Sequence, residues 1–306
     1  MRADGFRLHN FDPMYTVASY IMNKRTDSMN MITIDIPLEP VRNYLNEKRK
    51  EGRATSHLAV LIAAYLRVVS EYPELNRFIV NCKPYARNGV SVAMVVLKSG
   101  QADNGTMSKM FFELEDTVFD VDRKINEFVS ANRITPEKNG TEKMIRALLS
   151  VPGLCRVGVA IFKWMEKHGL LPKKLVDLSP FHNIIVVSDL ASIRTNHIYH
   201  HIYEFGTTSV FFAMGNLRDV PVRHGGEVQF ERCIPIGVVM DERICSGSYF
   251  AIAFRRLRKY MENPVLLEIP PETVKYDPAL TPKQLAKLEK MIAARKAAAK
   301  ENEQKA

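Results

Sequence analysis

The sequence predicts an α/β fold. Short apolar runs rich in β-branched residues, at residues 31–36, 90–97, 184–187 and 236–240, have the composition of buried strands. The stretches between and after these runs place apolar residues at three- and four-residue intervals, which predicts amphipathic helices. With 306 residues, 46% of them hydrophobic, the chain can bury a sizeable core in one large or two small domains.

The first hundred residues alternate between helix and strand patterns. Helices are predicted at residues 13–25, 38–50 and 55–72, and strands at residues 31–36 and 90–97. Pro13 suits the first turn of the first helix, and Gly52 and Pro73 end the second and the third. Because residues 90–97 form an unbroken apolar run, this strand is expected to be buried on both faces.

The middle of the chain carries more helical patterns. Helical spacing is found at residues 109–128, and residues 137–180 predict two further helices, at 141–150 and 154–168. The second of these carries Val157, Ile161, Trp164 and Met165. We expect it to pack on the domain as an additional core layer. Two alternatives stay open: a lid or wall of an acyl or cofactor channel, and a helix lying on a membrane surface.

The last third of the chain contains a strand, a polar turn and a helix in direct succession. The strand at residues 236–240 ends in Asp241-Glu242-Arg243, and a helix with an apolar face follows until Asn263-Pro264 stops it. Further strands are expected at residues 184–187, 202–214 and 228–239. Beyond residue 277 the sequence is rich in Ala, Lys and Glu, which predicts a solvated helix or a frayed tail.

Composition narrows the class of protein. No apolar run approaches the roughly 20 residues of a membrane span, and no charged-then-apolar leader begins the chain, so a cytoplasmic protein is expected. The four cysteines lie far apart without a C-x-x-C pair, which predicts reduced thiols and no metal site. Residues 282–306 hold seven Lys/Arg and three Glu, and this tail lacks the interleaved aromatics of a nucleic-acid contact.

The strand, turn and helix of residues 236–268 carry a resemblance to a known family. The turn reads D-E-R-I-C-S-G-S and the helix ends in M-E-N-P-V-L-L. The catalytic domains of the 2-oxoacid dehydrogenase acyltransferases, which are relatives of chloramphenicol acetyltransferase, carry D-H-R-x-x-D-G-A and E-x-P-x-x-L at these places. The frame is similar, but the position of the family's histidine is Glu242 here and that of its aspartate is Ser246.

Weaker similarities extend this resemblance over about residues 15–268. The Y-P-E-L-N of residues 72–76 resembles the family's H-P-E-L-N-A, and Ser188-Asp189-Leu190 stands where the family has I-S-N-L-G. The resemblance implies a chloramphenicol acetyltransferase-like two-layer α/β fold, with a mixed central sheet and helices packed on one face. It also implies a domain of residues 1–276, in which residues 137–180 are an extra helical segment, and a basic helical or disordered tail of residues 277–306.

The resemblance also implies a chemistry. The family transfers an acyl group between a thioester and a thiol or hydroxyl acceptor, in a channel between subunits of a trimer. Acyl-CoA is therefore the expected substrate, and the net charge of +9 suits its phosphates. Ser188 would donate a hydrogen bond to the oxyanion. Ser246 lacks the charge of the family's aspartate but could cap the following helix. No metal is expected, and no D-K-A word or long Pro/Ala linker indicates an attached lipoyl domain.

Glu242 is a weak replacement for a histidine base. An acceptor thiol has a pKa near ~8.5, so its proton moves to an imidazole near ~6.5 at a cost of ~3 kcal/mol, but to a carboxylate near ~4.3 at a cost of ~6 kcal/mol. Glu242 would need burial to act as the base. His200 and His201 are possible substitutes, although neighbours in a strand point to opposite faces and only one would face the site.

Two functions therefore stay open. The first is a CoA-dependent acyltransferase with an altered base, either Glu242 or one of the His200/His201 pair. The second is a non-catalytic trimeric scaffold or acyl-CoA-binding relative that has lost the catalytic histidine.

Overall fold

The computed structural model describes residues 2–97, 105–134, 150 and 153–305, and its centre is a mixed β-sheet. Within these residues the sheet has seven strands, in the order β2-β10-β8-β7-β5-β6 with β9 paired to β10. The strands are β2 (Met29–Pro37), β5 (Val90–Leu97), β6 (Gly105–Phe112), β7 (Ile185–Asp189), β8 (Val210–Met214), β9 (Arg218–His224) and β10 (Glu227–Asp241). The β5–β7 and β7–β8 pairs are parallel and the others are antiparallel, which makes the sheet mixed.

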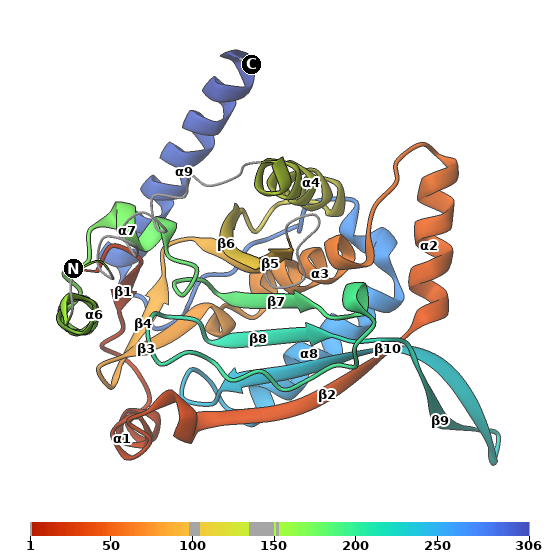
Figure 1. Ribbon diagram of the computed structural model, residues 1–306, viewed down its shortest axis with the longest axis horizontal. Helices are drawn as coiled ribbons and strands as arrows, with labels where there is room; N and C mark the ends of the chain where they lie inside the picture. Colours follow the sequence, from red (N-terminus) through yellow and green to blue (C-terminus); the bar gives the residue numbers. More distant parts are fainter. Residues whose placement is uncertain (1, 98–104, 135–149, 151–152, 306) are drawn as a thin grey trace.

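The helices packed on this sheet are α2 (Leu38–Lys50), α3 (His57–Glu71), α4 (Val118–Ile134) and α8 (Gly247–Glu262), of which α3 and α8 lie behind the strands in Figure 1. The central helix α3 packs against α4 and α8 and is buried along most of its length. The main core lies between helices and strands and includes Leu61, Phe212 and Ile236. This two-layer arrangement confirms the predicted fold class.

The opposite face of the sheet carries a smaller cluster that includes Val186, Phe211 and Val239. No helix lies over these three strands among the described residues; instead, an extended segment of residues 194–206 runs lengthwise over this face of the sheet (Figure 1). The contact is close. A Cβ atom on Gly237 would lie 2.2 Å from the carbonyl oxygen of Ile198, and one on Gly215 would lie 2.0 Å from the His197 nitrogen. The two glycines therefore allow the segment to lie directly on the sheet.

A second sheet, in the order β1-β4-β3, lies at one end of the molecule (Figure 1). Its strands are β1 (Gly5–Arg7), β3 (Arg77–Val80) and β4 (Lys83–Arg87), and the helices at this end are α1 (Pro13–Ile21), α6 (Leu154–His168) and α7 (Lys173–Leu178). Short 3-10 helices are η1 (Arg25–Ser28), η2 (Pro73–Asn76), η3 (Ala191–Ile193) and η4 (Pro264–Leu267). Within the described residues, no helix has the length and hydrophobicity needed to cross a bilayer.

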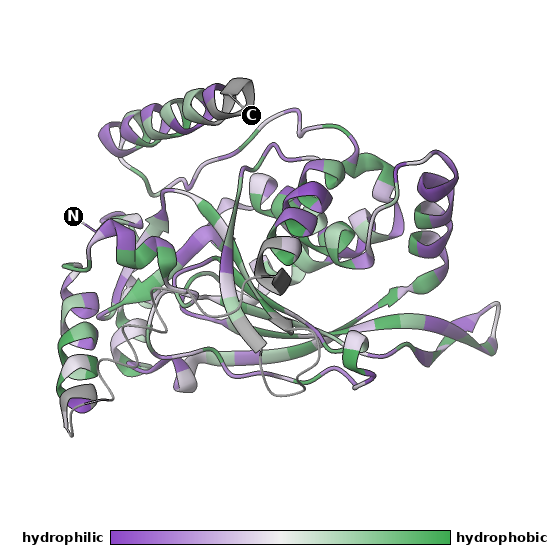
Figure 2. Ribbon diagram, turned by 45° about the horizontal axis from the view of Figure 1, so that its top comes forward, coloured by the Kyte–Doolittle hydropathy of each residue, from purple (hydrophilic) through white to green (hydrophobic). Residues whose placement is uncertain are grey.

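The helix α6 confirms the predicted helix at residues 154–168, but not its predicted role. It docks through Glu166, whose carboxylate accepts from Arg2 Nη2 at 2.9 Å and whose carbonyl accepts from Arg2 Nη1 at 2.7 Å. The apolar side chains expected to join a core layer, Val157, Ile161 and Trp164, are each more than half exposed. The helix therefore leaves an apolar stripe uncovered, which Figure 2 shows as green along its length. The companion helix expected at residues 141–150 lies outside the described residues, apart from Ser150.

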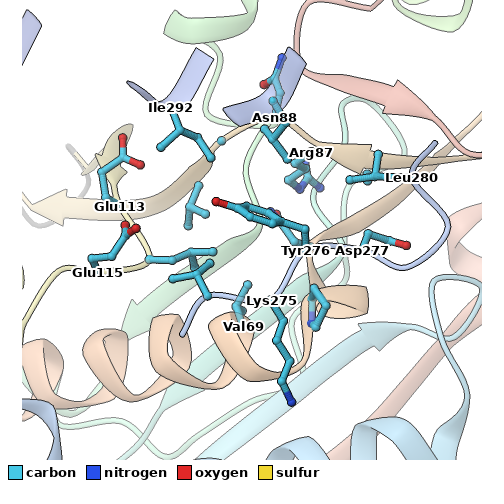
Figure 3. Close-up of a pocket in the computed structure, with 18 of the residues that line it drawn as sticks. Val69, Arg87, Asn88, Glu113, Glu115, Lys275, Tyr276, Asp277, Leu280 and Ile292 are labelled. Atoms are coloured by element: carbon cyan, nitrogen blue, oxygen red, sulfur yellow. The ribbon is translucent and has the colours of Figure 1, made fainter. Parts of the chain in front are cut away.

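The C-terminal helix α9 (Pro282–Lys305) packs on the body as far as Lys296, and its end projects beyond the body (Figure 1). Leu288 is buried, and Lys296 Nζ lies 2.8 Å from Glu115 Oε1. A cavity of about 50 Å³ lies beneath the helix, where Figure 3 shows Tyr276 between Val69 and Ile292. This volume suits only a few water molecules, so the cavity is too small for an acyl donor.

Five strands, β1, β3, β4, β6 and β9, were absent from the sequence-based expectations. The prediction of a helix at residues 109–128 is wrong for the first part of this range. Residues 105–112 form β6, and the helix α4 begins at Val118. Lys109 pairs with Ala93 of β5, and its Nζ donates to the carbonyl of Val176 at 2.6 Å, so tertiary pairing overrides the local pattern. The strand β9 was not expected either; it forms a hairpin with the first half of β10.

Candidate functional site

The turn after β10 is held by a buried carboxylate. Asp241 is fully buried and accepts hydrogen bonds from Arg243 Nε at 2.8 Å, from Arg243 Nη2 at 2.7 Å and from Ser28 Oγ at 3.0 Å. Arg25 Nε lies 3.4 Å away on the other side. Burial alone would raise the pKa of Asp241, but the two guanidinium groups hold it below its usual value. The turn therefore has a fixed backbone.

Glu242 follows in this turn and leans toward the edge strand β2. Its backbone N–H donates to the carbonyl of Ser28 at 2.9 Å, and its carboxylate accepts from Asn30 Nδ2 at 2.6 Å. The side chain is partly buried. Because Asp241 and Arg243 fix the backbone on both sides of it, Glu242 has a defined position at the end of the sheet.

Ser246 caps the helix α8. Its hydroxyl accepts from the backbone N–H of Tyr249 at 3.1 Å and lies 2.9 Å from the hydroxyl of Ser248. This is the N-cap arrangement expected from the sequence, since a helix leaves its first N–H groups without partners inside the helix.

Ser188 lies near the carboxyl end of β7 and is partly buried. Ile185 and Val187 of this strand belong to the helix-side core, whereas Val186 belongs to the cluster on the other face. Because side chains alternate along a strand, Ser188 lies on the face without helices. It pairs in parallel register with Ala213 of β8.

Ser188 and Glu242 lie at opposite ends of the sheet. Ala213 faces Gly237 of β10, so Ser188 is level with Gly237, two strands away. Glu242 follows five residues later. At ~3.3 Å per residue and ~4.8 Å per strand, the two residues are about 17 Å apart along the strands and about 10 Å apart across them. Within one chain the two side chains cannot act on the same atom.

His200 and His201 do not point to opposite faces, as a strand would require. They belong to the irregular segment that lies over the sheet, and their rings stack with centroids 4.7 Å apart. His200 also stacks on Phe211, with centroids 4.3 Å apart, and its Nδ1 lies 2.7 Å from the carbonyl oxygen of His201. The prediction failed because residues 200–203 are not in a strand. His201 is exposed and His200 only partly buried.

Two cavities lie on either side of the turn. One of about 430 Å³ is bounded by α6, the β3–β4 turn and residues 204–206, and Arg243 and Arg25 line it. The other, of about 360 Å³, lies at the N-terminus of α8 and is lined by Cys245, Ser246 and Tyr249. The turn that carries Glu242 is therefore the wall between two spaces large enough for parts of an organic ligand. Among the described residues, no three His, Cys, Asp or Glu side chains are placed to hold a metal.

No protein-family model matches the sequence, and no curated protein sequence matches it. Several solved structures, however, have a similar fold. A probable dihydrolipoamide acetyltransferase from Listeria monocytogenes is 13% identical, with a TM-score of 0.53 over 83% of this chain and 94% of that chain. The Azotobacter vinelandii dihydrolipoamide acetyltransferase, studied for a serine, a histidine and an asparagine in its catalytic mechanism, is 12% identical, with a TM-score of 0.56 over 83% and 88%.

Chloramphenicol acetyltransferase itself is 10% identical, with a TM-score of 0.50 over 84% of this chain and 99% of that chain. The fold is chloramphenicol acetyltransferase-like. This likeness confirms the mixed sheet with helices on one face, and it spans nearly the whole length of the compared proteins. At these identities it establishes the architecture and not the activity.

Within this chloramphenicol acetyltransferase-like fold, two features near the expected site residues were missed from the sequence. His57, the first residue of α3, lies close to Asp189 beside Ser188. Burial lowers the pKa of His57, an effect that the Asp189 carboxylate opposes, and burial raises the pKa of Asp189. The second feature is the cavity lined by Lys163 and Lys167 of α6. No sequence motif predicts either feature, because each joins segments far apart in the chain.

Proposed function

We propose that this protein is an acyltransferase that moves an acyl group between a CoA thioester and a thiol or hydroxyl acceptor, at a site shared by two copies of the chain in a homotrimer. The supporting observation is the separation of Ser188 and Glu242. Each lies at an end of the sheet, so the end that carries Ser188 in one copy can meet the end that carries Glu242 in the next. A site of this kind exists only in an assembly.

In this site the step is a simple acyl exchange. The base removes the proton from the acceptor thiol or hydroxyl, and the resulting nucleophile attacks the thioester carbonyl carbon. The oxygen that gains charge accepts a hydrogen bond from the Ser188 hydroxyl, which lowers the barrier by roughly 3 kcal/mol. The carbon–sulfur bond then breaks, the acyl group stays on the acceptor, and the proton held by the base goes to the departing CoA thiolate.

Glu242 is the first candidate for the base. It is partly buried, and Asp241 and Arg243 fix the backbone on either side of it, although Glu242 itself lines neither of the two neighbouring cavities. Approach of a second copy would bury it further and exclude water from the site. His200 is the substitute, since its Nδ1 is engaged by a carbonyl and Nε2 is left for an acceptor.

A second candidate function is an acyl-CoA-binding or scaffolding trimer without catalysis. The observation that favours it is the contact of Glu242 with Asn30, an exposed residue of the edge strand β2. A carboxylate placed near solvent is a poor base for a thiol. In this alternative the fold and the assembly persist, and only the chemistry is lost.

The experiment is an acyl-exchange assay. The protein is incubated with acetyl-CoA or longer acyl-CoAs and a panel of thiols, and free CoA is followed over time. Turnover that falls at least ~100-fold in Glu242→Gln, but little in His200→Ala and His201→Ala, assigns the base to the glutamate. Loss in His200→Ala alone assigns it to that histidine. CoA binding without turnover in any acyl-donor and acceptor pair would contradict the acyltransferase and support the binding protein.

A further inference from the structure

The larger of the two cavities at the turn has an unusual charge pattern. Its volume is about 430 Å³, and the charged side chains that line it are Arg25, Lys163, Glu166, Lys167, Glu204 and Arg243. Four are cations and two are carboxylates. The cavity opens between α6 on one side and the turn that follows β10 on the other.

The two carboxylates are already engaged. Glu166 accepts from Arg2 Nη2 at 2.9 Å, and Glu204 accepts from the backbone N–H of Arg25 at 2.7 Å. Arg25 and Arg243 share one buried carboxylate, Asp241, so this group of three keeps a net positive charge. Cations therefore outnumber carboxylates on the cavity wall even after these pairings are taken into account.

Lys163 and Lys167 are the free cations of this cavity. They lie one helical turn apart, so both ammonium groups are on the same side of α6. Both side chains are exposed, and neither has a hydrogen bond or an ion pair to any residue that the structure describes. The two lysines and the two arginines repel one another across the cavity. An anion bound between them would relieve this repulsion.

We infer that this cavity binds the phosphate groups of the CoA thioester, with Lys163 and Lys167 as the residues that contact them. The inference rests on the proposed function. Ammonium groups pair well with phosphate oxygens. The guanidinium groups of Arg25 and Arg243 already donate to Asp241 and to backbone carbonyls, so they add positive charge to the wall and leave the direct phosphate contacts to the two lysines.

The position of the cavity also fits this ligand. In CoA the sulfur and the phosphates are separated by the whole pantetheine arm, so a phosphate site must lie away from the base. Arg243 lines the cavity, whereas its neighbour Glu242 does not. The pantetheine arm would then run from the cavity past the turn toward Glu242. A site at Glu242 itself would place a polyanion beside a carboxylate, which is unfavourable.

The chain supplies its own reporter for a test. Trp164 is the single tryptophan of the 306 residues, and it lies in α6 next to Lys163. Its ring is 4.7 Å from that of His168 and more than half exposed. Trp164 does not line the cavity but is next to Lys163 in the chain, so its emission reports on this helix, and equilibrium dialysis measures binding directly.

The experiment titrates the full-length protein with CoA, with inorganic diphosphate and with pantetheine, which carries no phosphate. Emission is followed together with equilibrium dialysis. The test variant is Lys163→Glu with Lys167→Glu. The control is Lys173→Glu with Lys174→Glu, which makes the same charge change on the neighbouring helix α7, outside the cavity. We expect the test variant to weaken CoA and diphosphate binding at least ~10-fold and to leave pantetheine binding unchanged, while the control stays within about twofold of the parent protein.

The outcomes separate this inference from the proposed function. If the parent protein binds CoA and the test variant binds it equally well, the phosphates bind elsewhere and the inference fails, although the acyltransferase can stand. If diphosphate binds and depends on the lysines but no acyl exchange occurs, the anion site stands and the enzyme does not. If neither CoA nor diphosphate binds the parent protein, the inference is overturned.

Discussion

Ser188 of β7 lies level with Gly237 of β10, whereas Glu242 follows beyond the far end of the same strand. The hydroxyl and the carboxylate thus belong to opposite ends of one sheet, and an active site that uses both must join two chains. Assemblies that mix variant chains can test this without a structure of the trimer.

Mixing two inactive variants should restore activity. Ser188→Ala and Glu242→Gln are each expected to be inactive in the acyl-exchange assay, since each lacks one group of every site. When the two are co-expressed with different tags and purified as mixed trimers, one of the three sites in each trimer regains both groups, so about a third of the parent activity should return. Trimers that contain one variant alone are the control. Mixed trimers as inactive as the single variants would place both residues in a site within one chain, or in none.

Removing the charge of Asp241 should destabilise the turn and the fold. Asp241→Asn leaves Arg25 and Arg243 buried without an anion, at an expected cost of about 3–5 kcal/mol in the free energy of unfolding, measured by denaturant titration. Asp219→Asn is the matched control, because Asp219 and its partner Arg232 are both more than half exposed and contribute at most about 1 kcal/mol. Equal losses in the two variants would contradict the role of Asp241.

Asp241 also predicts the direction of a pH effect. Its pKa is lowered in the folded protein by Arg243 and Arg25, against the effect of burial. The stability it contributes is therefore present above the unfolded-state pKa near ~3.9 and is lost as the pH falls through the lower folded-state value. The unfolding free energy of the parent protein should drop more steeply below about pH 4 than that of Asp241→Asn. If the unfolding free energies of the two proteins fall in parallel as the pH is lowered, Asp241 is not the group responsible for the pH dependence.

Ser246 should matter for stability and not for turnover. Ser246→Ala removes the cap on the Tyr249 N–H and should cost about 1 kcal/mol in the free energy of unfolding. Ser248→Ala, in the first turn of the same helix but without a bond to a backbone N–H, should cost less than half of this. If Ser246→Ala lowers turnover strongly while the fold stays intact, the serine has a catalytic role that the capping geometry does not explain.

A methyl group on Gly237 should displace the segment that lies over the sheet. The added Cβ would lie 2.2 Å from the Ile198 carbonyl oxygen, so either the segment or the strand must move, at an expected cost of about 1–3 kcal/mol. Gly247→Ala is the control, because nothing lies within 4 Å of its Cβ position. Proteolysis of the segment and thermal unfolding are the measurements. A Gly237→Ala protein as stable and as resistant as the control would show that the contact is loose.

The spacing of apolar residues along the sequence was sufficient to predict many of the helices and strands. The strand at residues 236–240, the turn and the helix α8 are local, since apolar spacing, a capping serine and Asn263-Pro264 specify them within some 30 residues. The same holds for α2 and α3. Where the local pattern was wrong, at β6, pairing with β5 decided the outcome, because the energy of a strand comes from its neighbours in the sheet.

The sequence by itself determined the α/β class, the order of the main elements and the capping of α8 by Ser246, because these depend on residues close together in the chain. Only the tertiary structure decided that Ser188 and Glu242 lie far apart, that His200 and His201 stack together, and that the lysines of α6 share a cavity with Arg243. Each of these relationships depends on the register of strands or on the docking of a helix, and these are set by contacts between residues far apart in the chain.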